Sequence, residues 1–93
     1  MNERHCYIIC YDLCQPNRNY EELYLALKSF PAWGRLTESV WAIVSEKDAV
    51  EIRDYLLNYI DRNDRLIVVL SGKSAAWIKC LANNEWIKNN LVL

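Results

Sequence analysis

The sequence predicts an α+β domain of the ferredoxin-like type, with the order βαββαβ, a four-stranded antiparallel sheet, two helices on one face and a short helical C-terminal extension. The observations behind this class are runs of β-branched and aromatic residues alternating with segments whose apolar residues recur at the spacing of a helical face. A chain of 93 residues with only two glycines and two prolines suits one compact domain. We expect a single domain over residues 1–93, with a core from about 5 to 71 and the extension from about 74 to 93.

The first strand is predicted over His5–Asp12, where aromatic and aliphatic residues precede a turn-forming stretch. We expect this strand to be central and buried on both faces. Strand alternation places Cys6, Ile8, Cys10 and Asp12 on one face, and His5, Tyr7, Ile9 and Tyr11 on the other. A helix follows over about 20–30, with Asn19 and Glu22 at the spacing of a capping box.

The segment 33–45 is extended in pattern and predicts two strands that turn near Glu38 and Ser39. Ser45 is then predicted to cap a second helix. The apolar stripe of that helix comprises Ala49, Ile52, Leu56, Tyr59 and Ile60. An apolar strand over 66–70 completes the βαββαβ order.

The C-terminal extension is predicted to hold a helix over 74–81, capped by Ser74, and a further helical turn or two over 84–91. Two of the four tryptophans, Trp77 and Trp86, lie in these segments. We expect them either to cover the open face of the sheet or to pack across a subunit boundary.

Charge and hydropathy exclude several classes of protein. A net charge of −1 and a pI near 5.8 give no overall attraction to a phosphate backbone, although a local patch remains compatible with nucleic-acid binding. No stretch approaches the roughly 20 apolar residues of a membrane span, so we expect no membrane partner and a cytoplasmic location.

The four cysteines are too few for a disulfide scaffold, and we interpret them as thiols that serve as small apolar fillers. The spacing of Cys6, Cys10 and Cys14 resembles a zinc motif. However, residues four apart on a strand are separated by roughly 13 Å, so one tetrahedral ion cannot reach both Cys6 and Cys10.

Asp12 is the candidate for chemistry, because it ends the central strand at an edge of the sheet where loops gather. It suits a metal or ligand site, but the residues alone favour a carboxylate that accepts backbone N–H groups from the following turn. Asp12 has no second ligand within its own segment. If two copies stack sheet to sheet in a homodimer, their aspartates can share a divalent cation and activate water for phosphodiester cleavage.

Most cations are interspersed with acids and are predicted to be ordinary solvated surface: Lys28, Arg35, Arg62, Arg65, Lys73, Lys79 and Lys88. Arg18 differs, because it follows Asp12 in the same loop. A cation there suits a scissile phosphate.

Three fragments in this order resemble a known family: Tyr7–Leu13, Ser39–Trp41 and Leu66–Val69. They are similar to the SinR-like branch of the superfamily that contains the small CRISPR-adaptation subunit (Cas-two) and the virulence-associated protein D ribonucleases. The resemblance covers roughly residues 7–70. The arginine-rich stretch expected after the aspartate is reduced here to Arg18.

The resemblance implies a ferredoxin-like homodimer in which Asp12 is the catalytic carboxylate and the ligand of Mg²⁺ or Mn²⁺, with Arg18 near the phosphate and Ser39 as a supporting polar group. The expected function is metal-dependent cleavage of RNA or DNA, or nucleic-acid binding by a catalytically inactive descendant. The alternative is a non-enzymatic interaction module: a scaffold or other protein partner in a defence system, a toxin–antitoxin partner, or a phage-encoded inhibitor.

Overall fold

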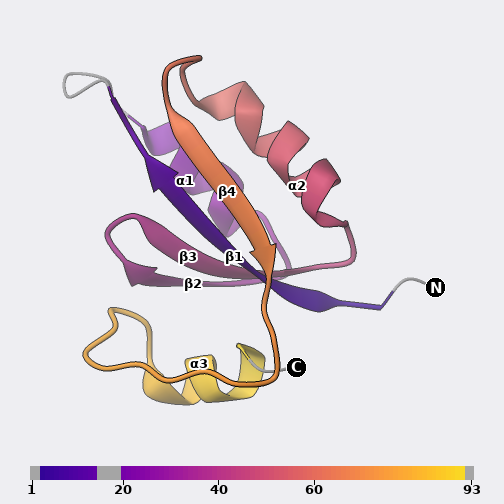
Figure 1. The fold of residues 1–93 in the computed structure, drawn as a ribbon, viewed down its shortest axis with the longest axis vertical. Coiled ribbons are helices and arrows are strands. Elements are labelled where there is room, and N and C mark those ends of the chain that lie inside the picture. Colours follow the sequence, from indigo (N-terminus) through magenta and orange to yellow (C-terminus); the bar gives the residue numbers. More distant parts are fainter. Residues whose placement is uncertain (1–2, 15–19, 92–93) are drawn as a thin grey trace.

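The computed structural model describes residues 3–14 and 20–91. Its elements are β1 (His5–Asp12), α1 (Glu21–Lys28), β2 (Ala32–Thr37), β3 (Val40–Ser45), α2 (Ala49–Leu56), a 3₁₀ turn η1 (Leu57–Tyr59), β4 (Arg65–Leu70) and α3 (Asn84–Asn90). The strands form one antiparallel sheet in the order β2-β3-β1-β4 (Figure 1). The predicted α+β class, the four-stranded antiparallel sheet and the bounds of the first strand are therefore confirmed.

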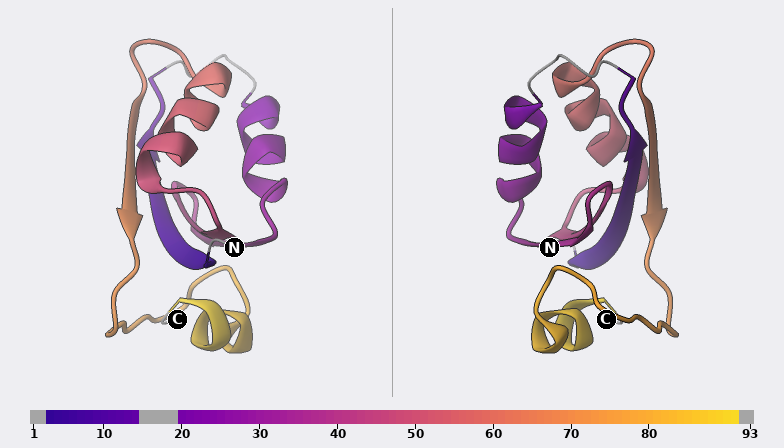
Figure 2. Two further views of the ribbon diagram at one scale, coloured as in Figure 1. Left: turned by 90° about the vertical axis from the view of Figure 1, so that its right-hand side faces the viewer. Right: turned by 90° about the vertical axis from the view of Figure 1, so that its left-hand side faces the viewer.

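The sheet is covered on both faces, but by different elements. The two longer helices, α1 and α2, lie together on one face, and the C-terminal segment with α3 lies against β2 and β3 from the other side (Figure 2). β4 forms one edge of the sheet, and no element of the described part of the chain covers its face on the side away from α1 and α2 (Figure 2). No helix within 3–14 and 20–91 is long and apolar enough to cross a bilayer.

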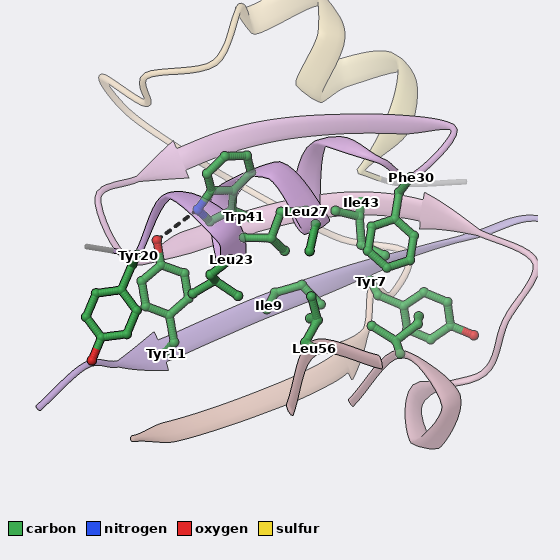
Figure 3. Close-up of a cluster of buried hydrophobic side chains, with 12 residues drawn as sticks. Tyr7, Ile9, Tyr11, Tyr20, Leu23, Leu27, Phe30, Trp41, Ile43 and Leu56 are labelled. Carbon is green, nitrogen blue, oxygen red and sulfur yellow. Dashed lines mark hydrogen bonds between the residues drawn. The ribbon is translucent and has the colours of Figure 1, made fainter. Parts of the chain in front are cut away.

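The main core fills the space between the sheet and the two helices (Figure 3). The inward residues of β1 are Tyr7, Ile9 and Tyr11, as strand alternation predicts. The helices contribute apolar side chains at one-turn spacing: Leu23, Ala26 and Leu27 from α1, and Ile52 and Leu56 from α2.

A second, smaller core lies on the opposite face of the sheet. Cys6 and Ala42 of the sheet belong to one buried cluster with Ile87 and Leu91, and both tryptophans of the extension pack against this cluster. Trp77 and Trp86 therefore cover the open face of their own chain, which is one of the two predicted positions. Gly34 permits this packing, because a Cβ there would lie 2.7 Å from Cζ3 of Trp86.

Several local predictions are wrong. α2 is capped by Asp48, whose carboxylate accepts from the N–H of Glu51 while the Glu51 side chain accepts from the N–H of Asp48. Ser45 instead ends β3, where its hydroxyl accepts from the N–H of Lys47. The proposed Asn19 cap lies outside the described residues.

The segment 74–81 is not a helix, so Ser74 caps nothing, whereas α3 confirms the second helical prediction in the extension. The cysteine interpretation holds only in part. All four cysteines are free thiols, but Cys14 is exposed, and its thiol donates to the carbonyl of Asn63.

Candidate functional site

An open cavity of about 570 Å³ lies where the carboxyl end of β1 meets the turn between β2 and β3. Its lining contains two predicted site residues, Asp12 and Ser39. The full lining is Tyr11, Asp12, Leu13, Tyr24, Arg35, Glu38, Ser39 and Leu81. The volume suits a nucleotide-sized ligand, and the mixture of carboxylates, hydroxyls and one guanidinium suits a polar one.

The β2–β3 turn is fixed against β1 by hydrogen bonds to its backbone carbonyls. The Tyr11 hydroxyl donates to the carbonyl of Glu38 at 2.9 Å, and the Tyr11 N–H donates to the carbonyl of Ser39 at 3.1 Å. Nη2 of Arg35 donates to the same Glu38 carbonyl at 2.7 Å. Ser39 is thus held at the cavity by backbone bonds.

Arg35 is the functional candidate that the sequence interpretation missed. Its guanidinium lies 4.8 Å from the ring centre of Tyr24 and 5.3 Å from that of Trp41, so it is held by cation–π contacts. Its Nε atom is buried and has no hydrogen-bond partner among the described residues. The prediction of an ordinary solvated cation is wrong, and the arrangement leaves a fixed donor group at the cavity.

Tyr11 serves as a structural donor in this site. Nε1 of Trp41 donates to the Tyr11 hydroxyl at 3.0 Å (Figure 3), and that hydroxyl in turn donates a hydrogen bond to the Glu38 carbonyl. Burial is the largest influence on the pKa of Tyr11 and raises it, outweighing the lowering effects of Trp41 and Arg35. The phenol is therefore protonated at neutral pH and is not the base of a reaction there.

Asp12 stands at the rim of the cavity and is accessible to solvent. Its side chain is 67% exposed, and Oδ2 lies 3.4 Å from Nη1 of Arg65, whose side chain is 81% exposed. An ion pair this exposed is screened by water, so a cation or ligand displaces it at little cost. Arg18, the predicted phosphate contact, lies outside the described residues.

The donor set at Asp12 fits a divalent cation only in part. Within 3–14 and 20–91, no three His, Cys, Asp or Glu side chains gather closely enough to hold a metal ion. Asp12 and Glu38 line the same cavity, but they do not make a complete cage. Mg²⁺ commonly keeps several waters and binds through one or two carboxylates plus substrate phosphates, and this pattern fits the site.

A second carboxylate, Asp64, organises the loops beside the site. It accepts from the N–H of Cys14 at 2.7 Å, the N–H of Asp61 at 2.8 Å and the Tyr20 hydroxyl at 3.0 Å. These bonds join the segment after β1 to the loop before β4. The sequence interpretation placed Asp64 in an exit loop and assigned it no role.

Comparison with known proteins adds no family assignment. No family model matches the chain, and no solved structure matches it.

Proposed function

We propose that the chain is a ferredoxin-like nucleic-acid-binding protein that cleaves RNA or DNA with Mg²⁺ or Mn²⁺, with the site at the cavity between β1 and the β2–β3 turn. The ferredoxin-like assignment is supported by the βαββαβ order and by the strand order β2-β3-β1-β4. The observation that carries the function is the convergence of Asp12, Ser39 and Arg35 on one cavity.

Each of the three residues has a distinct role in this proposal. Arg35 holds a phosphate with donors that cation–π contacts keep in place. Asp12 would hold the cation, which would supply a water of lowered pKa and positive charge beside the phosphate. Ser39 offers a hydroxyl beside them. Arg18 remains part of the proposal as a second phosphate contact.

The charges of the cavity predict that nucleic acid and cation bind together. Asp12 and Glu38 supply two carboxylates, against Arg35 in the cavity and Arg65 at 3.4 Å from Asp12, so these charges roughly cancel and a bare phosphodiester gains little net attraction. A bound divalent cation would make the net charge at the cavity positive. Removal of the cation with a chelator should therefore weaken nucleic-acid binding as well as abolish cleavage.

The test uses the full chain with labelled single-stranded RNA and DNA, in Mg²⁺, in Mn²⁺ and in chelator. Asp12→Asn should abolish cleavage, and Arg35→Lys should weaken binding by about tenfold, because lysine loses the planar donor fork. Asp54→Asn and Arg53→Lys are matched controls, since these two residues form an exposed Arg–Asp pair at 2.9 Å.

The outcomes distinguish an active nuclease from an inactive descendant that only binds nucleic acid. Binding without cleavage, weakened by Arg35→Lys, identifies an inactive descendant. Binding or cleavage that neither variant alters would show that this cavity is not the site. A chain that binds neither RNA nor DNA in any of these buffers would exclude the function as a whole.

A specific observation favours the alternative of a protein-interaction module. The C-terminal segment exposes two large aliphatic side chains, Ile78 at 81% and Leu81 at 65%. Exposed apolar groups on a segment without helix or strand structure suit a protein partner, such as a component of a defence system. Co-purification of a partner that Ile78→Lys releases would support this function.

A further inference from the structure

The two edges of the sheet differ in a way that bears on assembly. β2, at one edge, follows Pro31, contains Arg35 and has a register shift between Arg35 and Thr37. A proline, a charged residue and a bulge are the usual protections against pairing with another chain. β4, at the other edge, is regular and has one charged residue, Arg65 at its first position.

β4 also exposes apolar side chains. Ile67 is 56% exposed, Val69 47% and Leu70 55%. On the neighbouring helix α2, Val50 is 54% exposed and lines a groove beside Leu66, Ile67 and Val68. The unprotected edge is therefore flanked by aliphatic groups on both sides, which is costly in water for an isolated chain.

The backbone of β4 is oriented to accept another strand. The N–H of Ser71 donates to the carbonyl of Cys6 at 2.9 Å, and Val69 and Ile67 lie opposite Ile8 and Cys10. Because bonding alternates along an antiparallel pair, the odd-numbered residues of β4 direct their backbone groups to β1. Leu66, Val68 and Leu70 therefore direct theirs to the open edge.

We propose that β4 is a homodimerisation edge, at which two copies of the chain pair their β4 strands antiparallel about a two-fold axis at Val68. The strand is self-complementary about this residue. Ile67 of each copy faces Val69 of the other, and Leu66 faces Leu70. The three residues with outward backbone groups then face one another, so hydrogen bonding and side-chain pairing agree on one register.

The charges of β4 do not oppose a second copy as the occupant. In this register Arg65 lies opposite Ser71, so the two arginines do not meet. A foreign peptide would need no such symmetry within β4. The sheet-to-sheet dimer expected from the sequence is disfavoured, because the C-terminal segment occupies much of the face on which it would stack.

The edge dimer does not rest on the proposed function. Arg65, which contacts Asp12, lies three residues from the axis in each copy. Six residue steps along a strand span roughly 20 Å, so the two Asp12 carboxylates cannot share one ion in this dimer. Each cavity therefore acts within its own chain.

The experiment measures oligomeric state by size-exclusion chromatography with light scattering over about 1–100 μM chain. We expect a dimer, and Ile67→Lys/Val69→Lys should raise its dissociation constant about tenfold or more, because like charges then face each other twice. Leu25→Lys/Ile78→Lys is the matched control, since both residues are exposed and lie outside β4. It should leave the dimer intact.

Two further variants test the register itself. Ile67→Lys/Val69→Glu should dimerise, because opposite charges meet only when the axis lies at Val68. Ile67→Glu/Val69→Glu should be monomeric alone and form a heterodimer when mixed with the double-lysine chain. This mixture also shows that each charged chain is folded.

Amide hydrogen exchange provides the second readout. The N–H groups of Leu66, Val68 and Leu70 should gain protection as concentration rises. The inference is overturned by a monomer throughout the concentration range, or by a dimer in which these amides stay unprotected. A preparation in which β4 is occupied by a different protein likewise refutes a second copy as the occupant.

Discussion

Gly34→Ala tests whether α3 lies on the sheet as described. The added Cβ would lie 2.7 Å from Cζ3 and 2.8 Å from Cε3 of the Trp86 indole. Carbon atoms in contact normally sit about 3.5–4.0 Å apart, so the indole must retreat by roughly 1 Å. Because Trp86 belongs to the core that joins α3 to the sheet, this retreat also disturbs the packing of its neighbours.

Whether Gly34→Ala lowers or raises the free energy of unfolding tests this position of α3. Overpacking costs about 1–3 kcal/mol. Against it stands a gain of about 0.5–1 kcal/mol, because Gly34 does not have a positive φ and alanine restricts the unfolded chain. The net loss is about 0–2.5 kcal/mol, which lowers the melting temperature by up to about 20 °C for a domain of this size.

Urea denaturation followed by circular dichroism provides the free energy of unfolding. Gly72→Ala is the matched control, since no atom lies within 4 Å of the Cβ it would carry. In a Trp86→Leu background the clash disappears, so Gly34→Ala should become neutral or stabilising. If Gly34→Ala stabilises the wild-type chain as much as it does the Trp86→Leu chain, the indole does not lie over Gly34, and the placement of α3 is wrong.

Two other predictions concern stability. Burial raises the pKa of Cys6 from 9.0 to about 11, so the folded state favours the thiol, and the stability this contributes is complete below pH 9.0 and lost between there and about 11. Cys6→Ala should remove this loss, which is at most about 3 kcal/mol, and urea denaturation at about pH 8 and 11 measures it. Asp64→Asn should cost about 1–3 kcal/mol in the same assay at neutral pH, because the carboxylate accepts hydrogen bonds from Cys14, Asp61 and Tyr20. Asp54→Asn should change stability by less than about 0.5 kcal/mol, and an equal loss in the two variants would contradict the role of Asp64.

The fold follows from the sequence where the signal is local. β1 alternates between two apolar faces, and the sequence assigns its residues to the correct sides because the period of a strand is fixed. The apolar stripe of α2 likewise predicts which face of that helix is buried. Its cap was misplaced by three residues because both Ser45 and Asp48 are good capping residues, and the choice depends on where β3 ends.

The segment 74–81 shows where local signals fail. Its composition favours a helix, but the N–H of Leu81 donates to the carbonyl of Leu36, and the indole N–H of Trp77 donates to Asn84. Lys79 has a φ of 55°, which interrupts any right-handed helix. Contacts with β2 and α3 therefore outweigh helix propensity, and these contacts are invisible before the fold is known.

Arg35 was missed for a similar reason. A two-residue turn at Glu38 and Ser39 pairs Thr37 with Val40, and continued regular pairing would place Arg35 opposite Ala42, on the face covered by α3. The register shift between Arg35 and Thr37 instead pairs Arg35 with Trp41. One extra residue thus moves the guanidinium to the face of Tyr24 and the cavity.

The net negative charge of the chain is compatible with the proposed nucleic-acid site, in which a divalent cation takes part. Proteins that bind nucleic acid through many lysines and arginines lose affinity steeply with salt, because each contact releases a counterion. Here the described lining of the cavity holds one guanidinium, Arg35, and two carboxylates, of which Asp12 lies 3.4 Å from Arg65. In the proposed function, the attraction to phosphate would come largely from a bound cation, so affinity should depend more on the divalent ion than on monovalent salt. In the proposed function, Asp12 would matter because it would hold that cation.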